Sequence, residues 1–484
     1  MAARPVTTDA AWTTVHASLA HWAACQPDAI AFDDGAIRLS FRALAARVDE
    51  SMRVLQRAGG QGPMPRWVDD AATPGAQLVQ FLGIVAAGDA AVVGDQDWST
   101  TVRRQVQALI GVEGLPDDTF YVGFTSGSTG LPKGYVRNHA SWTSSFRACL
   151  DTFGPGARTT LLAPGRLSHS LFLFAALLGL WTGAGVRLQS RFSAAACLES
   201  LRDGDAQSLM AVPSQLVLML EHAQRHGLPP IPSTRQVTIG GAAWPRTRTP
   251  QLRALFPRAR IVEFYGASET SFIAWTDSDP SQPASAVGRP FGNVALRIDP
   301  IAPTAADAAV DATMGRIYVR SPMVFTRYLT PQPADGPGAL LRDGDWLSVG
   351  DVGRLDTDGV LHLAGRQQRM FIVQGKNLFP EEVEQVLAAH PAVTSVSVQA
   401  TEDAVRGVST VAVLELAQAV DRRTLIAWCR ERLEAYKTPR RFHACETPWP
   451  RTASGKTDHA AIARRLAAHP EGPDGWSVMP WERR

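Results

Sequence analysis

The segment from Tyr121 to His139 concentrates residue types that hold phosphate groups in proteins. It reads YVGFTSGSTGLPKGYVRNH, and glycines, hydroxyl side chains and one lysine make up most of residues 125–134. Glycine lets a ligand approach the main chain closely, and hydroxyl and amide groups donate hydrogen bonds to an anion. The same residue types also form ordinary surface turns. The segment lacks the spacing of a P-loop, as does the later stretch PRTASGKT around Lys456.

Four further segments carry groups that suit nucleotide chemistry. FYGASET places Glu269 after an expected strand, where a carboxylate can hold Mg²⁺ on phosphates. SVGDVG contains Asp351, whose two oxygens can accept hydrogen bonds from both hydroxyls of a ribose. LAGRQQ supplies Arg366, a permanent cation, and PRTASGKTD presents Lys456 close to the end of the chain. Taken singly, these residues are more often turn formers, helix-start carboxylates or solvated surface charges.

Taken together and in this order, the five segments resemble the AMP-forming, acyl-adenylating superfamily. That superfamily includes acyl-CoA synthetases, luciferases and the adenylation domains of peptide synthetases, and the resemblance covers nearly the whole chain. It implies two half-reactions. A carboxylate first attacks the α-phosphorus of ATP and gives an acyl-adenylate and pyrophosphate. A thiol then attacks the activated carbonyl and releases AMP.

The resemblance also implies a role for individual residues. It assigns the β- and γ-phosphates to a loop and one lysine, namely Thr125, Ser126, Gly127, Ser128, Thr129, Gly130 and Lys133. It assigns Mg²⁺ to Glu269 and Thr125, the α-phosphate to Ser268, the ribose to Asp351 and Arg366, and the catalytic cation to Lys456. It assigns adenine to two segments, Gly241, Ala242, Ala243 and Glu263, Phe264, Tyr265, Gly266, with Tyr265 stacking on the ring.

Three further assignments concern the acid, the hinge and the thiol. His169, Val212 and Gly240 are expected to line the acyl pocket, although a histidine before an apolar helix is equally a packing or capping residue. Gln368 stands at the hinge position, and Gly375 lies where the pantetheine arm would pass. Ile372 departs from the pattern, because many relatives have lysine there.

Composition bounds the class of protein. The chain has 484 residues, of which 45% are hydrophobic and 19% are charged, with a formal net charge of +2. This length predicts at least two domains, and the balanced charge gives no support for nucleic acid or a membrane surface as the main partner. Five cysteines without CxxC spacing, no apparent secretory signal and no apolar run long enough to span a bilayer favour a cytoplasmic protein.

The elements that must position these residues are those of an α/β protein. Helical patterns, such as the one after Thr73 and Pro74, alternate with short apolar strands through most of the first three quarters. The alternation predicts stacked α/β layers with largely parallel sheets. After about residue 340, a hairpin around Asp358 and Gly359, short strands and two helices predict a small α+β unit. We place the domains at 1–367 and 368–484, and the resemblance implies that the second one, which carries Lys456, is mobile.

The segments expected around the acid are rich in Leu, Phe, Ala and Trp, which favours a fatty or aryl acid over a polar amino acid. The sequence therefore predicts an AMP-forming acyl-CoA ligase that uses ATP, Mg²⁺ and CoA. Three alternatives stay open. They are an acyl-AMP ligase that loads the phosphopantetheine of a carrier protein, an inactive nucleotide-binding relative, and a phosphotransferase that would release ADP.

Overall fold

The core of the large N-terminal body is a parallel sheet, seen in a computed structural model of the protein. The structure describes residues 12–57, 63–110, 114–125, 132–301, 314–329, 340–373, 376–403, 407–452, 455–469 and 475–479. The strands that lie side by side in this sheet are, in spatial order, β11 (Arg260–Ala267), β10 (Gln236–Ile239), β9 (Ser208–Ala211), β7 (Leu161–Ala163), β8 (Val186–Leu188), β1 (Ile30–Asp33) and β2 (Arg38–Ser40). All neighbours from β11 to β1 are parallel, and β2 closes the edge in the antiparallel sense.

Helices connect these strands and bury their apolar faces against the sheet. They are α1 (Ser18–Cys25), α2 (Phe41–Arg57), α3 (Pro74–Ala86), α5 (His139–Phe153), α6 (Ser170–Trp181), α7 (Ala194–Arg202), α8 (Pro213–Arg225) and α9 (Thr249–Leu255). Thr73 caps α3 as predicted, since its hydroxyl accepts the Ala76 amide at 3.3 Å. Helix α6 is apolar on all sides, as expected of a helix in the interior of a large domain.

A second sheet carries the hairpin that was predicted to bind phosphates. Its strands are, in order, β16 (Arg327–Tyr328), β6 (Lys133–Asn138), β5 (Thr119–Thr125), β4 (Ala90–Val92) and β3 (Pro65–Trp67), with α4 (Thr100–Ile110) between β4 and β5 along the chain. Strands β5 and β6 are antiparallel, and Thr125 pairs with Lys133 at the base of their connection. Residues 126–130 of the predicted phosphate loop lie outside the described residues.

The parallel sheet continues beyond β11 as an antiparallel one, an extension that the sequence did not indicate. Its strands are β12 (Ser271–Asp277), β13 (Ala286–Pro290), β20 (Leu361–Arg366), β19 (Asp351–Leu355), β15 (Gly315–Arg320), β14 (Ala295–Pro300), β18 (Trp346–Ser348) and β17 (Leu341–Asp343). The predicted hairpin around Asp358 and Gly359 is present as β19 and β20. Its two ends, Asp351 and Arg366, stand directly opposite each other.

The C-terminal part is the expected small α+β unit with an apolar core of its own. It starts with the hairpin β21 (Phe371–Val373) and β22 (Lys376–Leu378). A four-stranded sheet follows, of β23 (Val393–Asp403), β24 (Gly407–Leu416), β25 (Arg441–Cys445) and β26 (Trp476–Val478), with helices α10 (Pro380–Ala388), α11 (Arg422–Arg430) and α12 (His459–Ala468). Its core includes Leu378, Val398 and Phe442, each fully buried. The proposed division at 367/368 stays a prediction.

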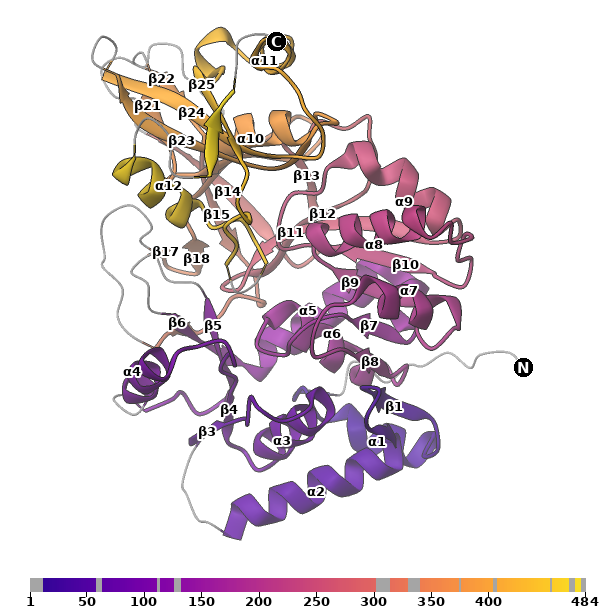
Figure 1. The fold of residues 1–484 in the computed structure, drawn as a ribbon. Helices are drawn as coiled ribbons and strands as arrows, with labels where there is room; N and C mark the ends of the chain where they lie inside the picture. Colours follow the sequence, from indigo (N-terminus) through magenta and orange to yellow (C-terminus); the bar gives the residue numbers. More distant parts are fainter. Residues whose placement is uncertain are drawn as a thin grey trace.

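Figure 1 shows the C-terminal sheet and helices α10, α11 and α12 at the top and helix α2 at the opposite end. The antiparallel strands β12, β14 and β15 lie between the C-terminal unit and the parallel sheet. Among the helices that the structure describes, none has both the length and the apolar character needed to cross a membrane.

The central position of α6 gives a stability prediction. Leu177 is fully buried in the main core, whereas Leu218 on α8 is 49% exposed. We expect Leu177→Ala to lower the free energy of unfolding by about 2–5 kcal/mol, because it removes buried methyl groups and leaves a cavity. The matched substitution Leu218→Ala should cost less than about 0.5 kcal/mol. Urea unfolding followed by circular dichroism measures both, and equal losses would contradict the assignment of α6 to the core.

Candidate active site

The carboxyl ends of β10 and β11 form the floor of the candidate site. The two strands are parallel with Ile239 opposite Glu263, so the turn that follows β10 lies beside the second half of β11. Strand β11 is longer than predicted and runs to Ala267, which makes Tyr265 part of the strand rather than of a loop. In open α/β sheets, ligands bind at this edge.

Two glycines let other groups come close to this edge. A Cβ built on Gly240 would lie 2.2 Å from atoms of the Phe264 ring, so only glycine fits there. Gly241 has a φ of +83°, which glycine adopts without strain, and its Cβ position lies 3.3 Å from Cγ1 of Val212. Ala242 and Ala243 follow it in the turn and are exposed.

Asp351 connects β11 with the β19–β20 hairpin. Its carboxylate accepts a hydrogen bond from the Tyr265 hydroxyl and another from Nε of Arg366 at 3.2 Å. Asp351 is 4% exposed, while the Arg366 side chain is 56% exposed. The Asp351 charge raises the pKa of Arg366, and burial, followed by the same charge, raises the pKa of Tyr265. Arg366 thus keeps its two terminal nitrogens directed to solvent or a ligand.

Glu269 lies in the turn between β11 and β12, next to Ser268, and is 9% exposed. Oε1 accepts a hydrogen bond from the Tyr328 hydroxyl at 2.6 Å, and Lys133 Nζ lies 5.9 Å from the centre of the Tyr328 ring. Within the described part of the chain, Oε2 accepts no hydrogen bond. Burial and the Glu269 charge raise the pKa of Tyr328 above its usual value, so the phenol stays a donor. One carboxylate oxygen therefore remains available.

Tyr328 is a site residue that the sequence did not reveal. It lies in the unremarkable stretch FTRYLT, 59 residues after Glu269. It reaches the site only because β16 pairs with β6, which places Tyr328 opposite Tyr135. No local pattern in the sequence signals this pairing.

Lys456 enters the site from the C-terminal unit. Its Nζ lies 4.0 Å from the Cβ position of Gly241, and it makes no hydrogen bond or ion pair with any residue that the structure describes. Lys456 as a whole is exposed, yet desolvation by the protein around its ammonium group lowers the pKa of Lys456, as does the charge of Arg366, while Glu269 acts in the opposite direction. The structure thus brings Lys456, Arg366, Glu269 and Gly241 to one place.

Two neighbouring residues were assigned to adenine, and their side chains have partners inside the protein. The Glu263 carboxylate is bound by Arg246 through two hydrogen bonds of 2.8 and 3.0 Å. The Phe264 ring packs edge-on against Phe272 with a centroid distance of 4.8 Å. Their main chains stay at the site edge with Gly266, so a contact to adenine there would come from the backbone.

His169 occupies the position before α6, but its side chain does not cap the helix. Burial lowers the pKa of His169, and among the charges that act on it are those of Asp95 and Lys456. Its assignment to the acyl pocket stays a prediction. Gln368 is exposed in the turn after β20, and Gly375 lies outside the described residues.

A separate hollow of about 620 Å³ lies on the antiparallel part, between residues 292–295, Arg320 and Arg342. It contains none of the residues predicted to bind nucleotide or acid. Its size alone gives it no chemistry, whereas the surroundings of Lys456 bring together two cations and the Glu269 carboxylate.

The lysine environment predicts an unusual titration. Burial lowers the pKa of Lys437 as well, but hydrogen bonds to Glu382 and Glu434 outweigh it and the pKa is raised. We therefore expect Lys456 to react with acetic anhydride at lower pH than Lys437, because its neutral amine is more populated. Arg366→Gln should raise the pKa of Lys456, and Glu269→Gln should lower it further. Mass spectrometry of labelled peptides across pH measures this, and a Lys456 midpoint above that of Lys437 would contradict it.

Comparison with known proteins shows which family the chain belongs to. The family model for the AMP-binding enzyme matches residues 83–329, and the model for its C-terminal domain matches residues 382–456. The uncharacterized acyl-CoA ligase YhfT of Bacillus subtilis is 35% identical over 353 residues, which are 72% of this chain and 69% of YhfT. The 2-succinylbenzoate–CoA ligase of Bacillus velezensis is 31% identical over 347 residues, 70% of this chain and 67% of that protein.

Solved structures agree in fold. O-succinylbenzoate coenzyme A synthetase (MenE) from Bacillus subtilis, in complex with ATP and magnesium ion, superposes with a TM-score of 0.76. It is 24% identical, and the match covers 92% of this chain and 98% of MenE. The large α/β domain and small C-terminal domain of these adenylate-forming enzymes are the architecture predicted from the sequence. The chain belongs to the AMP-binding, adenylate-forming enzyme family, among its acyl-CoA ligases.

Proposed function

We propose that this protein activates an apolar carboxylic acid with ATP and transfers the acyl group to CoA. The observation that carries the proposal is the Lys456 ammonium, which has no ion pair with a described residue and lies beside the Gly241 turn near Arg366 and Glu269. Two cations and one available carboxylate oxygen match a ligand that carries several negative charges and a metal ion. A triphosphate with Mg²⁺ beside a substrate carboxylate has that character.

In the first half-reaction, a carboxylate oxygen of the acid attacks the α-phosphorus. The bond from that phosphorus to the oxygen that bridges it to the β-phosphate breaks, and pyrophosphate leaves. Lys456 is placed to neutralise both the incoming carboxylate and the α-phosphate, which lowers the repulsion between two anions. Asp351 and Arg366 would hold the ribose, and Tyr265, fixed by its bond to Asp351, would present its ring to adenine.

The residues present fit a magnesium ion. Glu269 offers a buried carboxylate with one oxygen oriented by Tyr328 and the other without a described partner, and Thr125 ends β5 as a second oxygen donor. When bound, Mg²⁺ offsets the charge of the β- and γ-phosphates. Lys133, at the other base of the hairpin, would contact the same phosphates.

In the second half-reaction, the CoA thiolate attacks the acyl carbonyl, the bond from the carbonyl carbon to the AMP oxygen breaks, and AMP leaves. The thiol proton passes to solvent. Gly375 is the predicted point of passage for the pantetheine arm. Ile372, on β21, is 43% exposed and would leave this passage without the positive charge that many relatives place there.

The acid is proposed to be apolar, either fatty or aryl. Val212 lies beside Gly241 and the Phe264 ring lies against Gly240, and these apolar groups, together with His169, would line the acyl pocket. The relative named for 2-succinylbenzoate supports an aryl acid as one possibility.

An acid panel tests the proposal. Purified protein is incubated with ATP, Mg²⁺ and fatty or aryl acids, and the nucleotide product is identified by chromatography. We expect AMP and pyrophosphate with at least one acid, and an acyl-CoA when CoA is added. ADP would indicate a phosphotransferase, and no turnover with any acid would indicate an inactive relative. Loading of a holo-carrier protein without acyl-CoA formation would favour the acyl-AMP ligase.

Lys456→Ala gives a second test. We expect the rate of adenylate formation to fall by about 10²- to 10³-fold, as when a well-placed donor to developing negative charge is removed. Thioester formation from supplied acyl-adenylate should largely persist, because Lys456 acts only in the first step. Pyrophosphate release and acyl-CoA formation are measured separately, with Lys437→Ala as the control lysine. An equal loss of both steps would contradict the role of Lys456.

A further inference from the structure

The turn that joins the two parts of the protein is held from both sides. We call residues 366–369 the hinge segment. On the N-terminal side, Arg316 donates two hydrogen bonds of 2.8 and 3.2 Å to the side-chain Oε1 of Gln367. The backbone N–H of Gln367 donates to the Gly350 carbonyl at 2.9 Å. Gln368 is exposed, and its side chain makes no hydrogen bond with a described residue. The next residue, Arg369, belongs to the other side.

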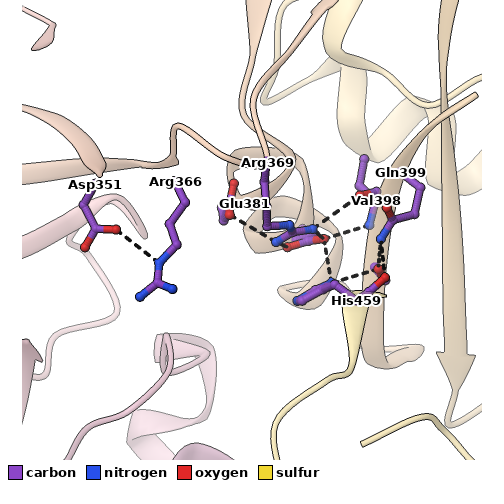
Figure 2. Close-up of polar contacts among 9 residues, drawn as sticks. Asp351, Arg366, Arg369, Glu381, Val398, Gln399 and His459 are labelled. Carbon is purple, nitrogen blue, oxygen red and sulfur yellow. Dashed lines mark hydrogen bonds and ion pairs between the residues drawn. The ribbon is translucent and has the colours of Figure 1, made fainter. Parts of the chain in front are cut away.

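Arg369 is bound by two carboxylates of helix α10. It donates to Glu381 at 3.1 Å and, through both terminal nitrogens, to Glu384 at 2.6 and 3.0 Å. We call these three residues the clamp. Figure 2 shows that the clamp lies apart from the Asp351–Arg366 pair, although only two residues separate Arg366 from Arg369 in sequence. The side chains of Arg369 and Glu384 are 21% and 12% exposed, so solvent screens their interaction only weakly.

Glu384 also contacts the elements that precede and follow in the direction of Lys456, namely β23 and the start of α12. Its Oε1 also accepts the Val398 amide at 2.7 Å and lies 3.5 Å from Nδ1 of His459. The same His459 nitrogen is 2.8 Å from the Ser397 hydroxyl, and Gln399 donates to the His459 carbonyl at 3.3 Å. Strand β23 is therefore hydrogen-bonded to the Glu384 carboxylate, and the first residue of α12 lies beside that carboxylate and is tied to β23 through Ser397 and Gln399 (Figure 2).

Hydrogen bonds within the C-terminal unit also fix the main chain of Lys456. The Thr452 amide donates to the Lys456 carbonyl at 2.8 Å, and Arg451 and Thr457 form a β-bridge. Trp449 Nε1 donates to the Thr457 hydroxyl at 3.1 Å. Lys456 itself has no ion pair with a described residue, so these contacts, and not its own charge, determine where it lies.

We propose that Arg369 is a positioning residue for acid activation. Through the clamp with Glu384, the backbone orientation at Gln368 determines where Lys456 lies. The inference rests on the proposed function and adds a coupling to it. Gln368 is the one residue between an anchor on the N-terminal body and an anchor on the C-terminal unit. When it rotates, everything from Arg369 to Lys456 moves together, because Glu384 joins the hinge segment, β23 and α12.

Separate assays of the two half-reactions test this coupling. We expect Arg369→Gln to lower kcat for pyrophosphate release by about 10²-fold, since small misplacements of catalytic groups have effects of this size, and to change thioester formation from supplied acyl-adenylate by less than about threefold. The KM for ATP should change little, because Arg369 does not touch the nucleotide site. Glu384→Gln should behave similarly, and the charge-exchanged pair Arg369→Glu with Glu384→Arg should recover part of the loss.

Arg432→Gln is the matched control. Arg432 lies in the same unit, pairs with Glu431 at 2.9 Å and is exposed, but has no described contact to the hinge segment or α12. We expect both half-reactions to be unchanged in this variant. If Arg369→Gln lowers both half-reactions equally, Arg369 only stabilises the fold, and if it lowers neither, the clamp does not position Lys456. Arg369→Lys keeps the charge and decides the question if the glutamine variant does not fold.

A cross-linking measurement needs no activity. Ala242→Cys and Lys456→Cys are combined in a Cys25→Ser background, and the rate of cross-linking by a short bismaleimide is followed by gel mobility. We expect Arg369→Gln to slow cross-linking several-fold, because residue 456 no longer stays near the Gly241 turn. An unchanged rate would overturn the proposal. If the unmodified protein activates no acid, the proposed function fails, and cross-linking still decides the role of the clamp.

Discussion

The candidate site depends on the parallel pairing of β10 with β11. Parallel neighbours end at the same edge of a sheet, and the register that sets Ile239 opposite Glu263 brings the Gly241 turn beside Tyr265. The antiparallel pairing of β19 with β20 then sets Asp351 opposite Arg366, and Asp351 reaches Tyr265 through a hydrogen bond. Main-chain hydrogen bonds therefore position most of the groups that would surround a nucleotide, and side-chain contacts only adjust their orientation.

Electrostatics explains why the cleft suits an anion. Arg366 has a carboxylate partner in Asp351, but Lys456 lies near Arg366 without a partner among the described residues. Partial desolvation and repulsion between the two cations both destabilise the charged form of Lys456. A polyanionic ligand would reverse both effects, and Mg²⁺ on Glu269 would moderate the excess negative charge. Without an anion, the charged form of Lys456 thus has an unfavourable electrostatic free energy, which a bound anionic substrate would remove.

Lys456 has no ion pair within the described part of the chain, and this affects how freely it could leave the site. A lysine held in the cleft by its own salt bridge would resist leaving, whereas one held by the main chain of its own domain can move with that domain. The contacts that fix Lys456 are the hairpin bond to Thr452 and the network around Glu384, all within the C-terminal unit. Under the proposed coupling, the two anchors on either side of Gln368 would give such a movement a defined pivot.

Residue types and short spacings were enough to predict the family, the order of the candidate nucleotide-binding segments and local elements such as the Thr73 cap. Such signals act over a few neighbouring residues. The hydrogen bonds of Tyr328 to Glu269, Arg246 to Glu263 and Arg369 to Glu384 became visible only in the folded chain. Each of these partners is selected by strand register and by packing of elements distant in sequence. Such pairings result from many weak contacts across the fold, and no short pattern records them.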